Sequence, residues 1–197
     1  MEFDFAQDHI LENDRAKLIP LREEHIDALA PLAKEASLWT YFLGRSNGFH
    51  NFQEYVLDAL EHRKKGKEYP FAVLDKTSKS FAGCTRFFDY DPTLKNIRLG
   101  YSWYGSEFRG SGLNKNTKYL LFEFAFEKLG VERVGLGAHD ENVVSIAAMK
   151  SVGCTHEGKI RNAFPSIHNA GRSDAILLGI LREEWEGYAK KDLKKKL

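Results

Sequence analysis

Residues 98–129 of the chain read RLGYSWYGSEFRGSGLNKNTKYLLFEFAFEKL. This stretch begins in a strand-like run that covers residues 96–104. Its second half has the apolar spacing of a helix, from about Asn114 to Leu129. The helix has two apolar faces, one made by Leu120, Leu121, Phe124, Ala125 and Leu129 and the other by Tyr119, Phe122 and Phe126. A helix that is apolar on two sides is expected to be buried between layers of the fold.

Two glycines occupy the turn between this strand and this helix, in the run Arg109-Gly110-Ser111-Gly112-Leu113-Asn114. Because glycine has no Cβ, backbone amides can come close to a ligand, and the start of a helix adds unpaired N–H groups and the positive end of the helix dipole. Arg109 adds a fork of donors suited to phosphate. The turn therefore indicates an anion site, with a tight turn that only begins a helix as the alternative. Neither a full dinucleotide-binding fingerprint nor a P-loop is present.

Other segments on both sides of this unit are also strand-like or helical. The seven expected strands are residues 15–21, 69–74, 80–88, 96–104, 131–138, 154–160 and 172–181. The expected helices are residues 26–33, 52–60, 114–129 and 142–152, followed by a Lys-rich tail that we expect to be a solvated helix end. This order predicts the α/β (α+β) class, with a mixed sheet of about seven strands flanked by four or more helices.

The length of 197 residues fits a single domain over residues 1–197. Its 29 basic and 28 acidic residues leave a net charge of +1, so bulk charge gives no means of holding nucleic acid or an anionic membrane. The N-terminus lacks the features of a secretory signal, and no apolar run approaches the roughly 20 residues of a membrane span. We therefore expect a cytoplasmic protein.

Cys84 and Cys154 are the only cysteines, and both lie in apolar segments. We expect two buried thiols, because that environment and a cytoplasmic setting favour neither a disulfide nor a metal site. No metal is expected elsewhere in the chain.

Three pieces of the sequence, in order and spacing, resemble the acetyl-CoA-binding core of the GNAT superfamily of N-acetyltransferases. They are Gly100-Tyr101-Ser102-Trp103 before the Arg-Gly-x-Gly turn, Leu129-Gly130-Val131-Glu132-Arg133-Val134, and Asn142-x-x-Ser145 followed by Val152-Gly153. In addition, Arg172-x-Asp174 and Glu184-Trp185 resemble a pattern of the branch that includes the ribosomal-protein alanine N-acetyltransferases. The resemblance covers residues 15–185 and implies a twisted, mostly antiparallel GNAT-like sheet.

The resemblance implies that acetyl-CoA is the co-substrate and that an amine is the acceptor. The pyrophosphate of coenzyme A would bind backbone amides of the turn, which are those of Arg109, Gly110, Ser111, Gly112, Leu113 and Asn114. The strand segment Tyr101, Ser102 and Trp103 would separate from the next strand at a β-bulge, pair with the pantetheine arm and aim one amide at the thioester oxygen. Asn142 would hydrogen-bond the pantetheine near the thiol, although its position also suits a helix N-cap.

The chain departs from the family at the position of the general acid. Many GNAT members carry a tyrosine seven residues after the position of Asn142, where this chain has Met149. Ser145 is the remaining candidate catalytic residue, with a hydrogen bond to sulfur or a place in a water relay as its role. An ordinary polar residue in the first turn of a helix is the alternative for Ser145. No general base is assigned among the carboxylates expected near the site, which are Asp89, Asp91, Glu107, Asp140, Glu141 and Asp174.

A protein or peptide N-terminal α-amine is the favoured acceptor. An α-amino group titrates near 8 and a lysine near 10.4, so the α-amine needs less help from a base. Two alternatives stay open, namely a small amine such as a polyamine, amino acid or antibiotic, and a non-catalytic acyl-CoA-binding module. The resemblance is also compatible with a homodimer.

Overall fold

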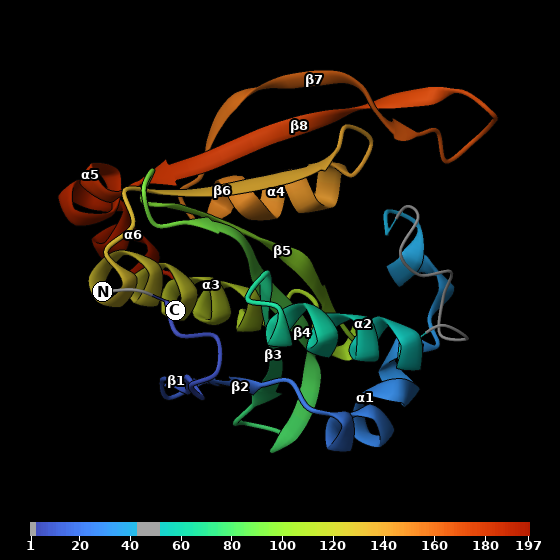
Figure 1. The fold of residues 1–197 in the computed structure, drawn as a ribbon, viewed down its shortest axis with the longest axis horizontal. Coiled ribbons are helices and arrows are strands. Elements are labelled where there is room, and N and C mark those ends of the chain that lie inside the picture. Colours follow the sequence, from blue (N-terminus) through green and yellow to red (C-terminus); the bar gives the residue numbers. More distant parts are fainter. Residues whose placement is uncertain (1–2, 43–51) are drawn as a thin grey trace.

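Eight strands form one sheet in the computed structural model, which describes residues 3–42 and 52–197. The strands are β1 (Leu11–Glu12), β2 (Ala16–Pro20), β3 (Glu68–Asp75), β4 (Ser80–Asp91), β5 (Asn96–Tyr104), β6 (Arg133–His139), β7 (Thr155–Pro165) and β8 (Arg172–Leu181). Their order across the sheet is β1-β2-β3-β4-β5-β6-β8-β7, and only β5 and β6 pair in parallel. The predicted class, a mixed and mostly antiparallel α/β sheet, is confirmed (Figure 1).

The helices cover both faces of this sheet. They are α1 (Ile26–Ala33), α2 (Phe52–Lys64), α3 (Leu113–Glu123) with its π-helical continuation η5 (Phe124–Leu129), α4 (Val143–Ser151), and the C-terminal α5 (Arg182–Glu184), η6 (Trp185–Ala189) and α6 (Lys190–Lys194). Three short 3-10 turns, η1 (Glu23–His25), η2 (Ala36–Trp39) and η4 (Ser106–Phe108), join them. The expected helix over residues 114–129 is therefore present as α3 and η5.

Two apolar clusters hold the helices against the sheet, one on each face. The larger cluster joins α3, α4 and the C-terminal helices to the sheet, and the smaller one joins α1 and α2 to it. Neighbouring residues of β3 alternate between them, since Phe71 and Val73 belong to the larger cluster and Ala72 to the smaller. The long helix has two apolar faces because both are buried: Leu121 from one face and Phe122 from the other are fully buried in the larger cluster.

The strands at the two edges of the sheet differ from their sequence-based boundaries. β1 has only two residues, too few to leave a pattern in the sequence. β7 continues to Pro165, whereas the sequence indicated an end at Ile160. Most of β7 is exposed, so its outer half carries no apolar alternation. β7 and β8 form a long hairpin, drawn in orange and red along the top of Figure 1.

The C-terminal tail is less solvated than its composition predicts. Leu193 is buried, and the Nζ of Lys190 lies 3.0 Å from a carboxylate oxygen of Glu123 and 2.6 Å from one of Glu127. The expectation of a frayed, solvated end is wrong for this lysine, because α6 packs along α3. Cys84 and Cys154 are both buried free thiols, as expected.

Within the described residues, no helix combines the length and the apolar character needed to cross a membrane.

We expect Gly83→Ala to destabilise the fold by about 3 kcal/mol or more, as overpacking against a rigid neighbour does. A Cβ on Gly83 would lie 1.9 Å from the backbone oxygen of Trp103, so β4 and β5 could not keep their spacing. Urea unfolding measures the difference. Gly158→Ala in β7 is the control, because its Cβ would meet nothing within 4 Å, and its stability should stay within about 0.5 kcal/mol of the wild type. Equal stabilities of the two variants would contradict the β4–β5 spacing described here.

Candidate active site

A gap opens in the middle of the sheet between its two parallel strands. β5 pairs with β6 only at Asn96, Ile97 and Arg98, whose partners are Arg133, Val134 and Gly135. Beyond this point β5 runs on to Tyr104 and β6 to His139, with no further pairing between these described strands (Figure 1). The side of β5 that faces β6 therefore presents backbone groups to the gap, and an extended ligand can pair with such an edge as an added strand does.

A β-bulge lies on β5 beside this gap. Cys84 pairs with Trp103 and Arg86 with Gly100, so two steps along β4 correspond to three along β5. The extra residue falls at Tyr101, whose φ of +51° lies in the left-handed region. A non-glycine residue in this region costs on the order of 1–3 kcal/mol and persists where its surroundings hold it. The separation of the strands and the bulge that were expected around Tyr101, Ser102 and Trp103 are both present.

Buried groups on the α2 side of the sheet hold the bulge. The guanidinium of Arg86 lies 4.4 Å from the ring centroid of Tyr55 and 4.3 Å from that of Tyr101. Arg86 also forms a buried ion pair with Glu68. The hydroxyl of Tyr55 donates a hydrogen bond of 3.4 Å to the backbone oxygen of Tyr101. Burial raises the pKa of Tyr55 to about 12, so this phenol keeps its proton and stays a donor.

A second set of polar groups lies on the α3 side of the bulge. The hydroxyl oxygens of Ser102 and Thr85 are 2.8 Å apart, and the Nζ of Lys118 donates a hydrogen bond of 2.8 Å to Ser102 Oγ. Lys118 is only 4% exposed, and burial lowers its pKa from the usual 10.5 to about 8. No carboxylate among the described residues compensates its charge. Sequence reasoning missed Lys118, because a lysine in a helix is normally solvated.

The glycine turn at the start of α3 has the features of an anion site. Gly110 and Gly112 have φ values of +72° and +86°, and a Cβ on either would meet nothing within 4 Å, so the turn is open on that side. Within the described part of the chain, the amides of Gly110, Ser111, Gly112 and Asn114 have no hydrogen-bond partner. The Leu113 amide makes only a long bond, 3.4 Å, to Ser111 Oγ. These amides lie at the positive end of α3.

Arg109 differs from the other residues of the turn. Its amide donates to the backbone oxygen of Ser106 at 3.2 Å. Its guanidinium makes two bonds of 3.0 Å to the carboxylate of Glu35 and one of 3.1 Å to the backbone oxygen of Tyr104. The side-chain fork that the sequence suggested for phosphate thus binds a carboxylate here. These bonds let the side chain of Arg109 stabilise the turn.

The first turn of α4 carries Asn142 and Ser145. Asn142 Oδ1 accepts a hydrogen bond of 3.1 Å from the amide of Ser145, so the N-cap interpretation of Asn142 is confirmed. Its NH2 group has no hydrogen-bond partner among the described residues. The hydroxyl of Ser145 has no hydrogen-bond partner among the described residues. Met149 is buried in the larger apolar cluster, so it supplies packing where many family members supply an acid.

The candidate carboxylates fall into separate groups. Asp89 and Asp91 lie near the β4–β5 turn, at the paired end of β5 and away from the gap. Asp140, Glu141 and Asp174 lie together where β6 meets the β7–β8 hairpin, with the amide of Asp140 bonded to the backbone oxygen of Asp174 at 3.1 Å. Glu107 lies apart from both groups, in η4.

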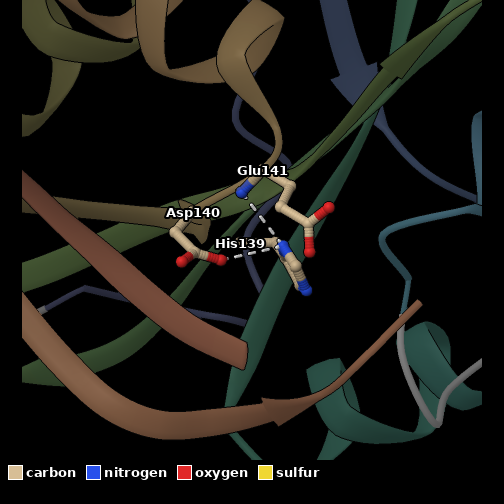
Figure 2. A group of neighbouring side chains, drawn as sticks. All are labelled: His139, Asp140 and Glu141. Carbon is tan, nitrogen blue, oxygen red and sulfur yellow. Dashed lines mark hydrogen bonds and ion pairs between the residues drawn. The ribbon is translucent and has the colours of Figure 1, made fainter. Parts of the chain in front are cut away.

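The carboxylates at the end of β6 already have side-chain partners. Lys159 Nζ is 2.7 Å from Asp174, and His168 Nε2 is 2.6 Å from Glu141. Figure 2 shows that His139 Nδ1 faces both the amide of Glu141, which donates to it at 3.1 Å, and Asp140, at 3.3 Å. His139, Asp140 and Glu141 could each place one ligand atom within 4.8 Å of the others. Because His139 Nδ1 already faces Asp140 and the Glu141 carboxylate already faces His168, we assign no metal to them.

The acetyltransferase (GNAT) domain family matches residues 15–155, so the chain belongs to this family. Its relative in Bacillus subtilis (strain 168), named "Putative ribosomal N-acetyltransferase YdaF", is 31% identical over 108 residues, which are 55% of this chain and 57% of that protein. The match therefore spans little more than half of the relative's length.

Solved structures of acetyltransferases share the fold over nearly the whole chain. A "putative acetyltransferase from T. thermophilus" is 26% identical with a TM-score of 0.82, and the match covers 96% of this chain and 97% of that one. Spermidine N-acetyltransferase from Vibrio cholerae, solved with CoA and spermine, is 18% identical with a TM-score of 0.73, over 88% of this chain and 99% of that one. At 18% identity the similarity establishes the fold alone.

We expect Lys118→Met to raise the free energy of unfolding at pH 7 by about 3 kcal/mol, since one pKa unit corresponds to 1.36 kcal/mol. The folded-state pKa of Lys118 is lowered to about 8 from 10.5, so the cost of burying the charge is fully present below pH 8 and is lost as the pH rises to 10.5. Urea unfolding at pH 7 and pH 10 should therefore show a smaller difference between variant and wild type at pH 10. A variant less stable than the wild type at pH 7 would show that the bond to Ser102 outweighs the burial cost.

Proposed function

We propose that the protein is an acetyl-CoA-dependent N-acetyltransferase that acts on a primary amine, most consistently the N-terminal α-amine of a protein or peptide. One observation carries the proposal, namely the edge of β5 that no longer pairs with β6 after Arg98 and that leads past the bulge to the open glycine turn of α3. Coenzyme A has a matching shape, because its extended pantetheine arm could pair with this strand edge and its pyrophosphate could bind the glycine turn. Family membership supports the same co-substrate.

The proposed binding mode follows the free amides of the glycine turn and the edge of β5 that does not pair with β6. The pyrophosphate lies on the free amides of Gly110, Ser111, Gly112 and Asn114, with that of Leu113 beside them. The pantetheine arm pairs with the β5 segment Tyr101–Trp103, and the NH2 group of Asn142 donates to it near the thiol. The engaged amide of Arg109 leaves this residue to hold the turn through Glu35.

In the proposed reaction the neutral amine attacks the thioester carbon. A new C–N bond forms, the C–S bond breaks, and the amine proton passes to water. An amide of the bulged segment donates to the carbonyl oxygen, where negative charge develops, and one such fixed donor contributes about 10² to 10³ in rate in other enzymes. The thiolate leaves beside Ser145, whose hydroxyl has no partner among the described residues and is free to hydrogen-bond the sulfur. The thiolate then takes a proton from solvent.

The choice of an α-amine follows from the charges near the gap. Lys159 Nζ lies 2.7 Å from Asp174 and 4.0 Å from Asp140, and His168 Nε2 lies 2.6 Å from Glu141, so each of these carboxylates already has a partner. The hydrogen bond from Lys159, above all, lowers the pKa of Asp174. An α-amine loses its proton near pH 8 without a strong base, whereas a lysine side chain does not. The ribosomal N-acetyltransferase name of the Bacillus subtilis relative supports the same acceptor class.

A small polyamine is the second candidate acceptor. Asp140, Glu141 and Asp174 gather at the end of β6, and such a group of carboxylates attracts a polycation. The Vibrio cholerae enzyme of similar fold acts on spermidine, as its name states. Lys159 offsets part of the negative charge of this group, which favours the α-amine.

We expect the protein to release coenzyme A from acetyl-CoA in the presence of short peptides with a free N-terminus, and to do so at least tenfold faster than with spermidine at equal concentration. The rate should rise from pH 6.5 to pH 8 as the α-amine loses its proton. Thiol release measures the rate, and peptides with a blocked N-terminus but a free lysine are the control. Faster turnover of spermidine would make the polyamine the acceptor, and no turnover of any amine would favour a non-catalytic acyl-CoA-binding module.

We expect Gly110→Glu to raise the Kd for acetyl-CoA at least tenfold, because a carboxylate would enter the anion site. Gly66→Glu is the matched control, since Gly66 also has a positive φ, +67°, with nothing within 4 Å of a Cβ, but lies at the end of α2. Calorimetry or the thermal midpoint with acetyl-CoA, coenzyme A and ATP separates the two variants. Equal binding by both would place the pyrophosphate elsewhere.

A further inference from the structure

Lys118 is a buried cation that the reaction described above does not use. It lies in the second turn of α3, is 4% exposed, and donates its 2.8 Å hydrogen bond to Ser102, the residue that follows Tyr101 in the bulge. α3 connects the two strands that separate, and it packs on the face of the sheet opposite to α2. The ammonium group therefore lies against the β5 segment on which the thioester is placed.

Among the residues that the structure describes, the groups around Lys118 leave its charge uncompensated. Ser102 of β5 and Thr85 of β4 offer only hydroxyls. Cys154, which precedes β7, is the other titratable group that acts on it, and burial raises the pKa of that thiol to about 12, so it is neutral. A buried charge without a counter-ion costs stability, and such groups occur preferentially where a reaction uses them.

Resting on the function proposed above, we propose that Lys118 is a positioning residue for acyl transfer. Through Ser102 Oγ its ammonium group fixes the bulged segment of β5, and its positive charge stabilises the negative charge that develops on the thioester beside that segment. The oxyanion and the departing thiolate then supply, during the reaction, the counter-charge that the resting protein lacks. In a site with low dielectric constant such a fixed charge acts strongly and needs no reorganisation.

A set of variants tests this role. Lys118→Met removes the charge and the hydrogen bond at similar volume, Lys118→Arg keeps a charge, and Ser102→Ala removes the acceptor. Lys128→Met, at an exposed lysine of the same helical segment, is the control and should keep the wild-type rate.

We expect Lys118→Met to lower kcat at least tenfold with the KM for acetyl-CoA within threefold, and Lys118→Arg to recover part of kcat. The double variant of Lys118→Met and Ser102→Ala should lose no more than the poorer single variant, because the two residues act through one bond.

The pH dependence gives a readout that simple packing would not change. The ratio of wild-type kcat to that of Lys118→Arg should fall above about pH 8, where Lys118 loses its proton while the guanidinium of the variant keeps its own. A Lys118→Met variant with kcat within twofold of the wild type would overturn the role of Lys118 and leave the proposed function intact. A wild-type protein that acetylates no amine at all would overturn both.

Discussion

The hydrogen-bonded ladder between β5 and β6 stops after three residue pairs, and the functional half of the molecule depends on that early end. Because the two strands separate there, one edge of β5 does not pair with β6 beyond Arg98. Such an edge in the centre of a sheet is unfavourable unless something else satisfies its backbone groups. In the function proposed above that partner is an extended ligand, whose charged part binds the glycine turn of α3 at the end of the same edge.

The position of the gap depends on buried charges on both sides of β5. On one face, Arg86 lies between two tyrosine rings and holds the left-handed residue Tyr101. On the other face, Lys118 is bonded to Ser102. Charges buried in this way cost free energy that apolar side chains of equal size would not. The fold thus gives up stability around the segment on which we propose that the thioester lies, as is common where activity and stability compete.

In the proposed reaction, the departing thiolate has no tyrosine acid beside it. Met149 is packed into the apolar cluster, so the candidate donor in the first turn of α4 is the hydroxyl of Ser145. A serine hydroxyl is a weak acid, and an electrostatic contribution from Lys118 lowers the demand on it. With an α-amine as acceptor, the demand on a general base is low as well, which agrees with the paired state of Asp140, Glu141 and Asp174. The site as a whole then works by placement and fixed charge more than by strong acids and bases.

The sequence by itself determined the elements whose signal is local. The apolar faces of residues 114–129, the glycines at 110 and 112, and the N-cap at Asn142 each reflect the conformation of a few consecutive residues, so spacing and residue type were sufficient to predict them. Only the tertiary structure decided the ionic contacts. Arg109 binds Glu35, 74 residues away, and Lys118 meets Ser102 across two elements, because burial and pairing depend on which segments the fold brings together. In sequence, Lys118 looks like a solvated helix residue and Arg109 like a phosphate ligand, whereas the partners of both follow from what surrounds them in space.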